Sequence, residues 1–130
     1  MNVVADTGKR ELLLVEDDTN LRTTMAMVLQ RAGFEVETAV SLPTARQQLQ
    51  LKQFDLLLLD LDLSGECGLP LLTEVSNHHT DTQTVIFSAQ ISTNLQQKAI
   101  SNGARGYLIK PVDPLEVIIF VRSLLACPSA

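Results

Sequence analysis

Two short acidic segments of this chain each follow a run of apolar residues. The first is LLLVEDD, which contains Glu16 and Asp17, and the second is LLLLDLDLS, which contains Asp60 and Asp62. Carboxylates that lie close together repel one another unless a cation offsets their charge, and hard oxygen ligands suit Mg2+. The two segments together therefore predict a magnesium site.

A hydroxyl group and a lysine follow two further apolar runs. Ser88 and Ala89 end the segment IFSA, and Lys110 precedes Pro111 in GYLIKP. A carboxylate beside a metal ion can attack a phosphoryl group, and a lysine and a hydroxyl can neutralise the phosphoryl oxygens. The chemistry predicted for the combined set is phosphoryl transfer to an aspartate.

Short apolar runs alternate with segments of helical periodicity, which indicates five strand and helix units. The expected strands are 12–15, 35–39, 56–59, 84–87 and 107–109, and the expected helices are 21–32, 42–49, 69–75, 95–99 and 115–125. Continuous apolar strands alternating with helices predict an α/β fold, with a parallel sheet covered on both faces. The functional crevice of such a sheet lies beyond the carboxyl ends of its strands, where all the residues named above are expected.

Composition and charge exclude several classes of protein. A chain of 130 residues with 45% hydrophobic residues is one globular domain, and its formal charge of -5 argues against direct binding of nucleic acid. No apolar run approaches the length of a membrane span. Cys67 and Cys127 have neither metal-site nor CxxC spacing, so we expect reduced thiols and a cytoplasmic location.

From residue 11 to residue 125 the sequence closely resembles the receiver domains of two-component response regulators, a CheY-like superfamily. Four separate motifs carry the resemblance in order: LLLVEDD, LLLLDLDLSGECG, IFSA and GYLIKP. The resemblance implies that Asp60 is the phosphoacceptor. It also implies that Asp17 and Asp60 bind Mg2+ directly, Glu16 through water, and Asp62 through its backbone carbonyl.

The resemblance assigns the remaining site residues as well. Ser88, Ala89 and Lys110 take the positions that contact the phosphoryl group, and Ser88 and Tyr107 take the positions of the switch. We also expect a cis peptide bond between Lys110 and Pro111, which would aim the lysine at the site. One departure is Ser64, because the family usually has proline four residues after the phosphoacceptor.

The implied fold is a single doubly wound, flavodoxin-like domain with five helices and a five-stranded parallel sheet of order 2-1-3-4-5. The expected organisation is an N-terminal arm at 1–10, a receiver domain at 11–126 and a C-terminal tail at 127–130. The implied partner is a sensor histidine kinase or a histidine phosphotransfer protein of a two-component or phosphorelay system. The domain would be a regulatory phosphoacceptor that catalyses its own phosphorylation and dephosphorylation, rather than an enzyme acting on other substrates.

An alternative reading rests on the pair Asp60 and Asp62. LLLLDLDLS also resembles the Asp-x-Asp segment of haloacid dehalogenase-type phosphatases, in which the first Asp is the nucleophile and the second the general acid. Those enzymes carry a further acidic pair after their lysine, whereas here the pair Glu16 and Asp17 precedes Asp60. A flavodoxin-like nucleotide binder is less consistent still, because EDDTN after the first strand would repel phosphate.

The last helix contains five consecutive apolar residues, 117–121, which cannot all face the sheet. The helical period places Leu115, Ile119 and Phe120 on or near the exposed side. This patch lies on the face that receivers commonly use for partners, built from the fourth helix, the fifth strand and the fifth helix. We therefore expect scattered surface apolar residues, a helix packed more deeply than usual, or a site for dimerisation or effector docking.

Overall fold

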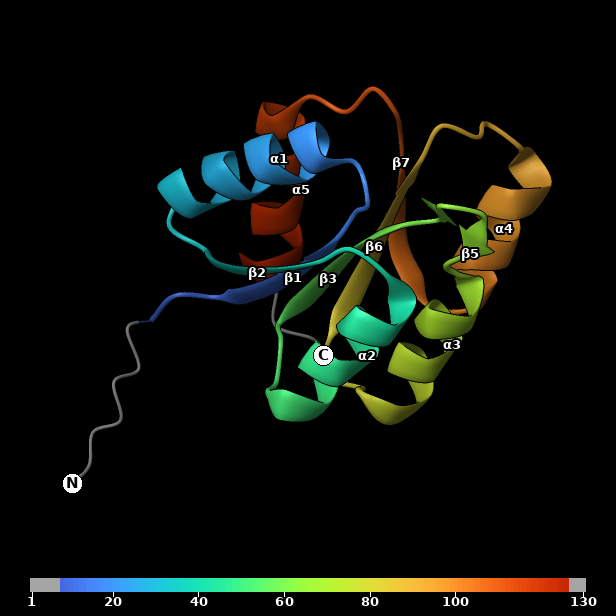
Figure 1. Ribbon diagram of the computed structural model, residues 1–130, viewed down its shortest axis with the longest axis horizontal. Coiled ribbons are helices and arrows are strands. Elements are labelled where there is room, and N and C mark those ends of the chain that lie inside the picture. Colours follow the sequence, from blue (N-terminus) through green and yellow to red (C-terminus); the bar gives the residue numbers. More distant parts are fainter. Residues whose placement is uncertain (1–7, 127–130) are drawn as a thin grey trace.

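The computed structural model describes residues 8–126 of the chain as a sheet with helices on both faces (Figure 1). Residues 1–7 of the expected arm and the expected tail, 127–130, lie outside the described residues. In chain order the elements are β1 (Glu11–Val15), α1 (Thr19–Arg31), β2 (Glu35–Ala39), α2 (Leu42–Leu51), β3 (Leu56–Asp60), β4 (Asp62–Leu63), β5 (Glu66–Cys67), α3 (Leu69–His78), β6 (Gln83–Ser88), α4 (Thr93–Ser101), β7 (Ala104–Ile109) and α5 (Pro114–Ala126).

The main sheet has the strand order β2-β1-β3-β6-β7, and all its strands are parallel. Since β6 and β7 are its fourth and fifth strands, the expected order 2-1-3-4-5 is confirmed. The chain moves from β1 outward to β2 and then returns to β3 on the other side of β1. The carboxyl ends of β1 and β3 therefore meet at the point where the strand order reverses, where ligands bind in sheets of this kind.

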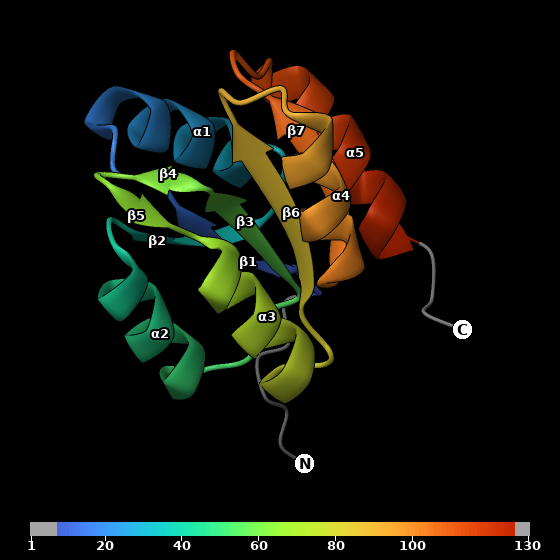
Figure 2. The same cartoon turned by 90° about the vertical axis from the view of Figure 1, so that its right-hand side faces the viewer.

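The four leucines of β3 are buried because both faces of the strand are covered. Leu57 and Leu59 belong to the core beneath α2, α3 and α4, whereas Leu56 and Leu58 belong to the core beneath α1 and α5. Figure 2 shows these two helical layers on opposite sides of the sheet. A continuous leucine run is thus what a central parallel strand requires, because each successive side chain enters a different core.

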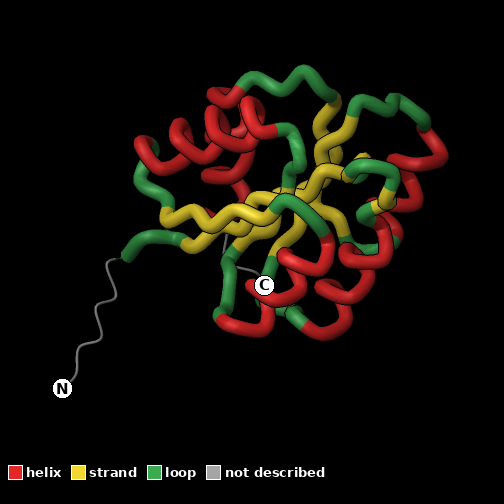
Figure 3. Tube along the Cα trace, viewed as in Figure 1, coloured by secondary structure: helices red, strands yellow, loops and turns green. Residues whose placement is uncertain are grey.

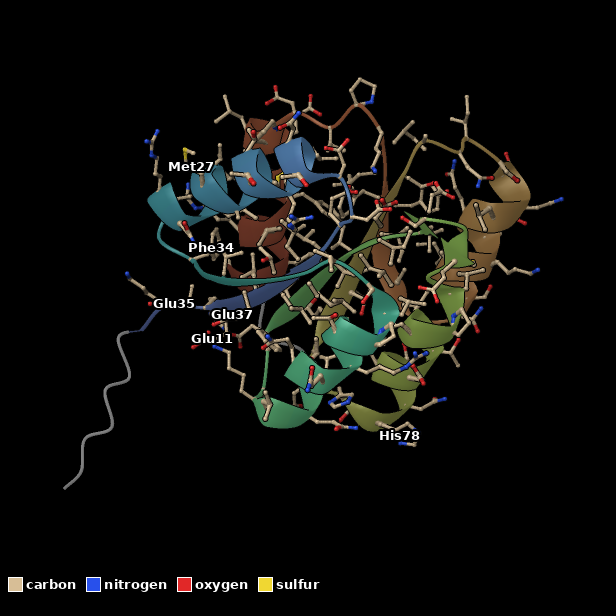
Figure 4. The ribbon with its side chains drawn as sticks, viewed as in Figure 1. Glu11, Met27, Phe34, Glu35, Glu37 and His78 are labelled. Carbon is tan, nitrogen blue, oxygen red and sulfur yellow. The ribbon has the colours of Figure 1, made fainter. Side chains whose placement is uncertain are left out.

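Charged side chains lie on the edge strand β2, and the outer faces of the helices carry both polar and apolar side chains. Glu35 and Glu37 are exposed on the edge strand β2, where charged residues discourage pairing with another sheet. Met27 on α1 is 43% exposed, and Figure 4 shows it and His78 on the outside of the molecule.

None of the helices in residues 8–126 has both the length and the apolar character that a membrane crossing requires.

A small antiparallel hairpin, β4–β5, follows β3 directly and was not among the expected elements. Asp62 pairs with Cys67 and Leu63 with Glu66, so Ser64 and Gly65 form a two-residue turn. Both turn residues have positive φ, 45° and 86°, as a type I′ turn requires. Proline, which has its φ fixed near -65°, could not adopt this conformation at position 64.

Candidate functional site

The loops that follow β1, β3, β6 and β7 lie on the same side of the molecule (Figure 3). Asp60 is the last residue of β3, and Glu16 and Lys110 directly follow β1 and β7. Ser88 ends β6, and Ala89 is exposed immediately after it. Because the parallel strands end together, residues up to 94 positions apart in the sequence meet at this edge.

A lysine and two buried carboxylates form the centre of the site. Nζ of Lys110 donates to Oε1 of Glu16 at 2.9 Å and to Oδ2 of Asp60 at 3.0 Å. Glu16 and Asp60 are each only 1% exposed, whereas the Lys110 side chain is 21% exposed. Nζ also lies 5.2 Å from the centroid of the Phe87 ring, and the Lys110–Pro111 peptide bond is cis, as expected.

The surroundings shift the pKa values of three of these groups. Burial raises the pKa of Glu16, although hydrogen bonds from the backbone of Asp18 and from Lys110 act in the opposite direction. Burial alone would lower the pKa of Lys110, but its hydrogen bonds to Glu16 and Asp60 outweigh burial and raise it. A hydrogen bond from Ser64 lowers the pKa of Asp17. At neutral pH the lysine therefore stays protonated between two acids.

The oxygens of three carboxylates lie close enough to share one cation. Glu16, Asp17 and Asp60 each offer an oxygen within 4.8 Å of the other two. These are hard oxygen donors, partly open to water through Asp17, so the residues present fit Mg2+ with several retained waters. The Ser64 hydroxyl donates to Oδ2 of Asp17, which ties the hairpin turn to the same cluster.

Asp62, the fourth predicted metal residue, directs its carboxylate away from that cluster. Its backbone N–H donates to Oδ1 of Asp60 at 2.9 Å. Its side-chain oxygens accept from the Ser88 hydroxyl at 2.8 Å and from the Gln90 amide at 2.9 Å. The expectation for Asp62 concerned its backbone carbonyl, so only a role for its side chain as a metal ligand conflicts with this geometry.

The two predicted switch residues are connected through Gln90. The Ser88 hydroxyl accepts from the backbone N–H of Gln90 at 3.0 Å, and the Tyr107 hydroxyl donates to the backbone carbonyl of Gln90 at 3.0 Å. Sequence reasoning missed Gln90. The only available signal was its position two residues after Ser88, in the loop beyond a strand end.

The predicted partner patch on α5 is only partly as expected. Leu115 and Ile119 are 64% and 70% exposed, in agreement with the helical period. Phe120 instead packs partly buried over Gly106 of β7, where only a residue without a Cβ leaves room for the ring. The exposed patch is therefore smaller than predicted, because a glycine in the neighbouring strand creates a place for the aromatic ring.

Asp18, the third acid of LLLVEDD, has a structural role. Its side chain accepts from the backbone N–H of Leu21 at 3.0 Å and so caps the N-terminus of α1. Asp18 lies outside the cluster formed by Glu16, Asp17 and Asp60.

Comparison with known proteins places these features in a family. Residues 12–122 match the family model of the response regulator receiver domain. The chain is 35% identical over 103 residues to the alginate biosynthesis transcriptional regulatory protein AlgB of Pseudomonas aeruginosa, covering 79% of this chain and 23% of that protein. The chain spans less than half the length of the curated regulators that it matches in this way.

Solved structures show the same architecture. A putative response regulator from Chloroflexus aurantiacus is 31% identical with a TM-score of 0.83, and the match covers 92% of this chain and 99% of that one. A response regulator from Burkholderia pseudomallei, solved with a phosphorylated aspartic acid, a calcium ion and citrate, is 21% identical with a TM-score of 0.80 and covers 94% and 77% of the two chains. With motifs, sheet order and family model in agreement, the chain belongs to the response regulator receiver domain family.

Proposed function

We propose that Asp60 accepts a phosphoryl group from the phosphohistidine of a sensor histidine kinase or of a histidine phosphotransfer protein. The observation that carries this proposal is the buried Asp60 carboxylate held 3.0 Å from Nζ of Lys110, beside two further acids at the switch point of the sheet. In the transfer, an oxygen of Asp60 forms a bond to phosphorus while the bond from phosphorus to the histidine nitrogen breaks. The donor imidazole leaves with the electron pair and takes up a proton.

The donor set supports a magnesium requirement. Glu16, Asp17 and Asp60 would hold the ion, and when bound the ion supplies positive charge that neutralises the phosphoryl oxygens. The Burkholderia relative, whose structure contains a calcium ion and a phosphorylated aspartic acid, supports the same pairing, since calcium also prefers oxygen ligands.

The remaining contacts to the phosphoryl group would come from residues of this chain. Lys110 supplies a fixed positive charge beside Asp60, and the Ser88 hydroxyl and the backbone of Ala89 stand at the rim to contact a phosphoryl oxygen. When Ser88 turns inward, Tyr107 follows and changes the face formed by α4, β7 and α5. The domain is thus a regulatory phosphoacceptor that promotes its own phosphorylation and dephosphorylation.

The phosphatase alternative requires Asp62 to carry a proton and give it to a leaving group. Both side-chain oxygens of Asp62 instead accept hydrogen bonds, one from Ser88 and one from Gln90, so neither is directed toward a leaving group at Asp60. This geometry favours the receiver function. Catalytic turnover of a phosphate ester by the purified chain would reverse that preference.

The experiment that tests the proposal is intact-mass analysis after incubation with acetyl phosphate and Mg2+. One phosphoryl group should be added to the wild type, and none to Asp60→Asn or in the presence of EDTA. Asp55→Asn is the matched control, because Asp55 lies just before the other end of β3 and should leave labelling unchanged. Undiminished labelling of Asp60→Asn would refute the assignment.

The exposed residues Leu115 and Ile119 support a partner surface on α5, used for a homodimer or an effector. Sedimentation of the wild type and of Ile119→Glu, with and without beryllofluoride as a phosphoryl mimic, tests self-association. Leu51→Glu is the control, because Leu51 is 74% exposed on α2, on the opposite side of the sheet. Monomers in every sample would eliminate the dimer and leave docking to another protein.

A cytoplasmic location belongs to the same proposal. It is supported by Cys67, a free and exposed thiol of the kind that a reducing compartment maintains.

A further inference from the structure

The carboxylate of Asp62 accepts the only hydrogen bond that the Ser88 hydroxyl can donate. Oγ of Ser88 donates to Oδ2 of Asp62 at 2.8 Å and accepts from the backbone N–H of Gln90 at 3.0 Å. A hydroxyl has one proton, so this donor is unavailable to any other acceptor while the contact persists. Ser88 is 0% exposed, so water offers no easy replacement.

Asp62 is also linked to Tyr107. The side-chain amide of Gln90 donates to Oδ1 of Asp62 at 2.9 Å, while the backbone carbonyl of Gln90 accepts from the Tyr107 hydroxyl at 3.0 Å. One residue therefore contacts the acid through its side chain and the tyrosine through its main chain. A displacement of Asp62 would free the Gln90 side chain and loosen the loop that receives Tyr107.

We propose that Asp62 is a positioning residue that competes with a phosphoryl group on Asp60 for the Ser88 hydroxyl, and so stabilises the unphosphorylated arrangement. The inference rests on the proposed role of Asp60 and deepens it. Asp62 is exposed on the β4–β5 hairpin, so its released carboxylate can be solvated at little cost. Removal of Asp62 should therefore favour the phosphorylated arrangement.

The first test needs neither metal nor phosphoryl donor. Tyr107 is the only tyrosine of the chain, so incorporation of 3-fluorotyrosine gives a single fluorine NMR signal at the switch. In metal-free, unphosphorylated protein, Asp62→Ala should move this signal toward the position that the wild type takes with beryllofluoride. Asp62→Asn should move it less, because an amide oxygen can still accept from Ser88. Identical signals in the wild type and Asp62→Ala would overturn the proposal.

Removal of one negative charge near the site could by itself change the affinity for an anion, so a matched control is needed. Glu66 supplies it, since this exposed residue lies on β5 of the same hairpin and takes no part in the hydrogen bonds that join Ser88 to Asp62 and Gln90. Glu66→Gln should leave the fluorine signal unchanged. A shift equal to that of Asp62→Ala would assign the effect to charge and overturn the proposal.

The second test measures beryllofluoride affinity in a double-mutant cycle. Asp62→Ala should tighten binding about tenfold, the effect of losing one hydrogen bond to a charged acceptor. The gain should disappear in a Ser88→Ala background, because no hydroxyl is left to compete for. A tenfold gain that persists without Ser88 would mean simple charge repulsion and contradict the proposal.

The two tests distinguish a failure of the role proposed for Asp62 from a failure of the role proposed for Asp60. If the wild type binds beryllofluoride and Asp62→Ala changes neither affinity nor the Tyr107 signal, the role of Asp62 is wrong while that of Asp60 stands. If the wild type fails to bind beryllofluoride and is not labelled by acetyl phosphate, both are wrong.

Discussion

Lys110 is the cation between two buried carboxylates, so its removal tests how the site is held together. Lys110→Met keeps an unbranched side chain of similar length and deletes the ammonium group. Glu16 and Asp60 would then be left 1% exposed without the donor that now lies 2.9 Å and 3.0 Å from them. We expect this variant to unfold more easily than the wild type in the absence of metal.

The magnitude follows from burial. Removal of one partner from a buried ion pair costs about 3–5 kcal/mol, because the other charge remains buried. The Lys110 side chain is 21% exposed, so solvent already screens part of the interaction, and the lower end of the range applies. A loss of about 3 kcal/mol, with a slope of about 2 kcal/mol per molar, lowers the midpoint by about 1.5 M urea.

The loss should also depend on pH. The pKa of Glu16 is raised by burial and lowered in part by Lys110, so Lys110→Met should raise it further. The folded variant then binds a proton more readily than the unfolded chain. The full loss of stability caused by Lys110→Met is therefore present above the raised pKa of Glu16. This loss becomes smaller as pH falls through that pKa toward the unfolded value of 4.5.

Urea unfolding followed by circular dichroism, in EDTA at about pH 7.5 and about pH 5.5, measures both effects. Lys52→Met is the matched control, because Lys52 also contacts two glutamates, Glu11 and Glu37, but at the surface. Exposed pairs of this kind contribute about 0–1 kcal/mol. Equal midpoints for Lys110→Met and Lys52→Met, or a loss of stability at Lys110 that ignores pH, would refute the reasoning.

Three further expectations address other parts of the site. Gly106→Ala should lower the free energy of unfolding, measured in urea, by about 1–3 kcal/mol, because its Cβ would overlap the Phe120 ring. Adding Phe120→Leu to the same chain should recover most of this loss, and no recovery would mean a backbone effect. Ser64→Pro should destabilise by more than about 1 kcal/mol although the family favours proline there, since proline cannot adopt φ 45°; a Ser64→Pro chain as stable as the wild type would show that the turn rearranges. Asp17→Asn should abolish the rise in melting temperature that Mg2+ produces in the wild type, and an unchanged rise would remove Asp17 from the metal site.

Much of the fold could be predicted from the alternation of apolar runs and helical periods. All five strand and helix units are present, but β7 begins at Ala104, earlier than the expected Tyr107. Arg105 and Gly106 lack the apolar character that marks a strand, yet tertiary context outweighs propensity and both lie in β7. Gly106 pairs with Val85 of β6, whereas Arg105 falls at a shift in the register. The short hairpin was missed because each of its strands has only two residues, too few for an alternating pattern to show.

The gathering of acids and lysine at one edge was equally predictable, since parallel strands end together. The direction of each side chain was not. Nothing in the sequence distinguishes an Asp62 that faces the metal cluster from one that accepts from Ser88, because that choice depends on the hairpin turn and on rotamers. For the same reason the helical period could place Phe120 on the helix but could not reveal the space above Gly106.

The leucine run of β3 has a consequence for how the chain finds its register during folding. A slip of one residue sends every side chain to the opposite face, but four consecutive leucines would fill either core almost equally well. The penalty must therefore come from the ends of the run. A slip in one direction would move Asp60 to the buried apolar position of Leu59, away from Lys110. A slip in the other direction would move Asp55 to the buried apolar position of Leu56. The carboxylate proposed to receive the phosphoryl group thus also serves as a stop that keeps a repetitive strand aligned with its neighbours.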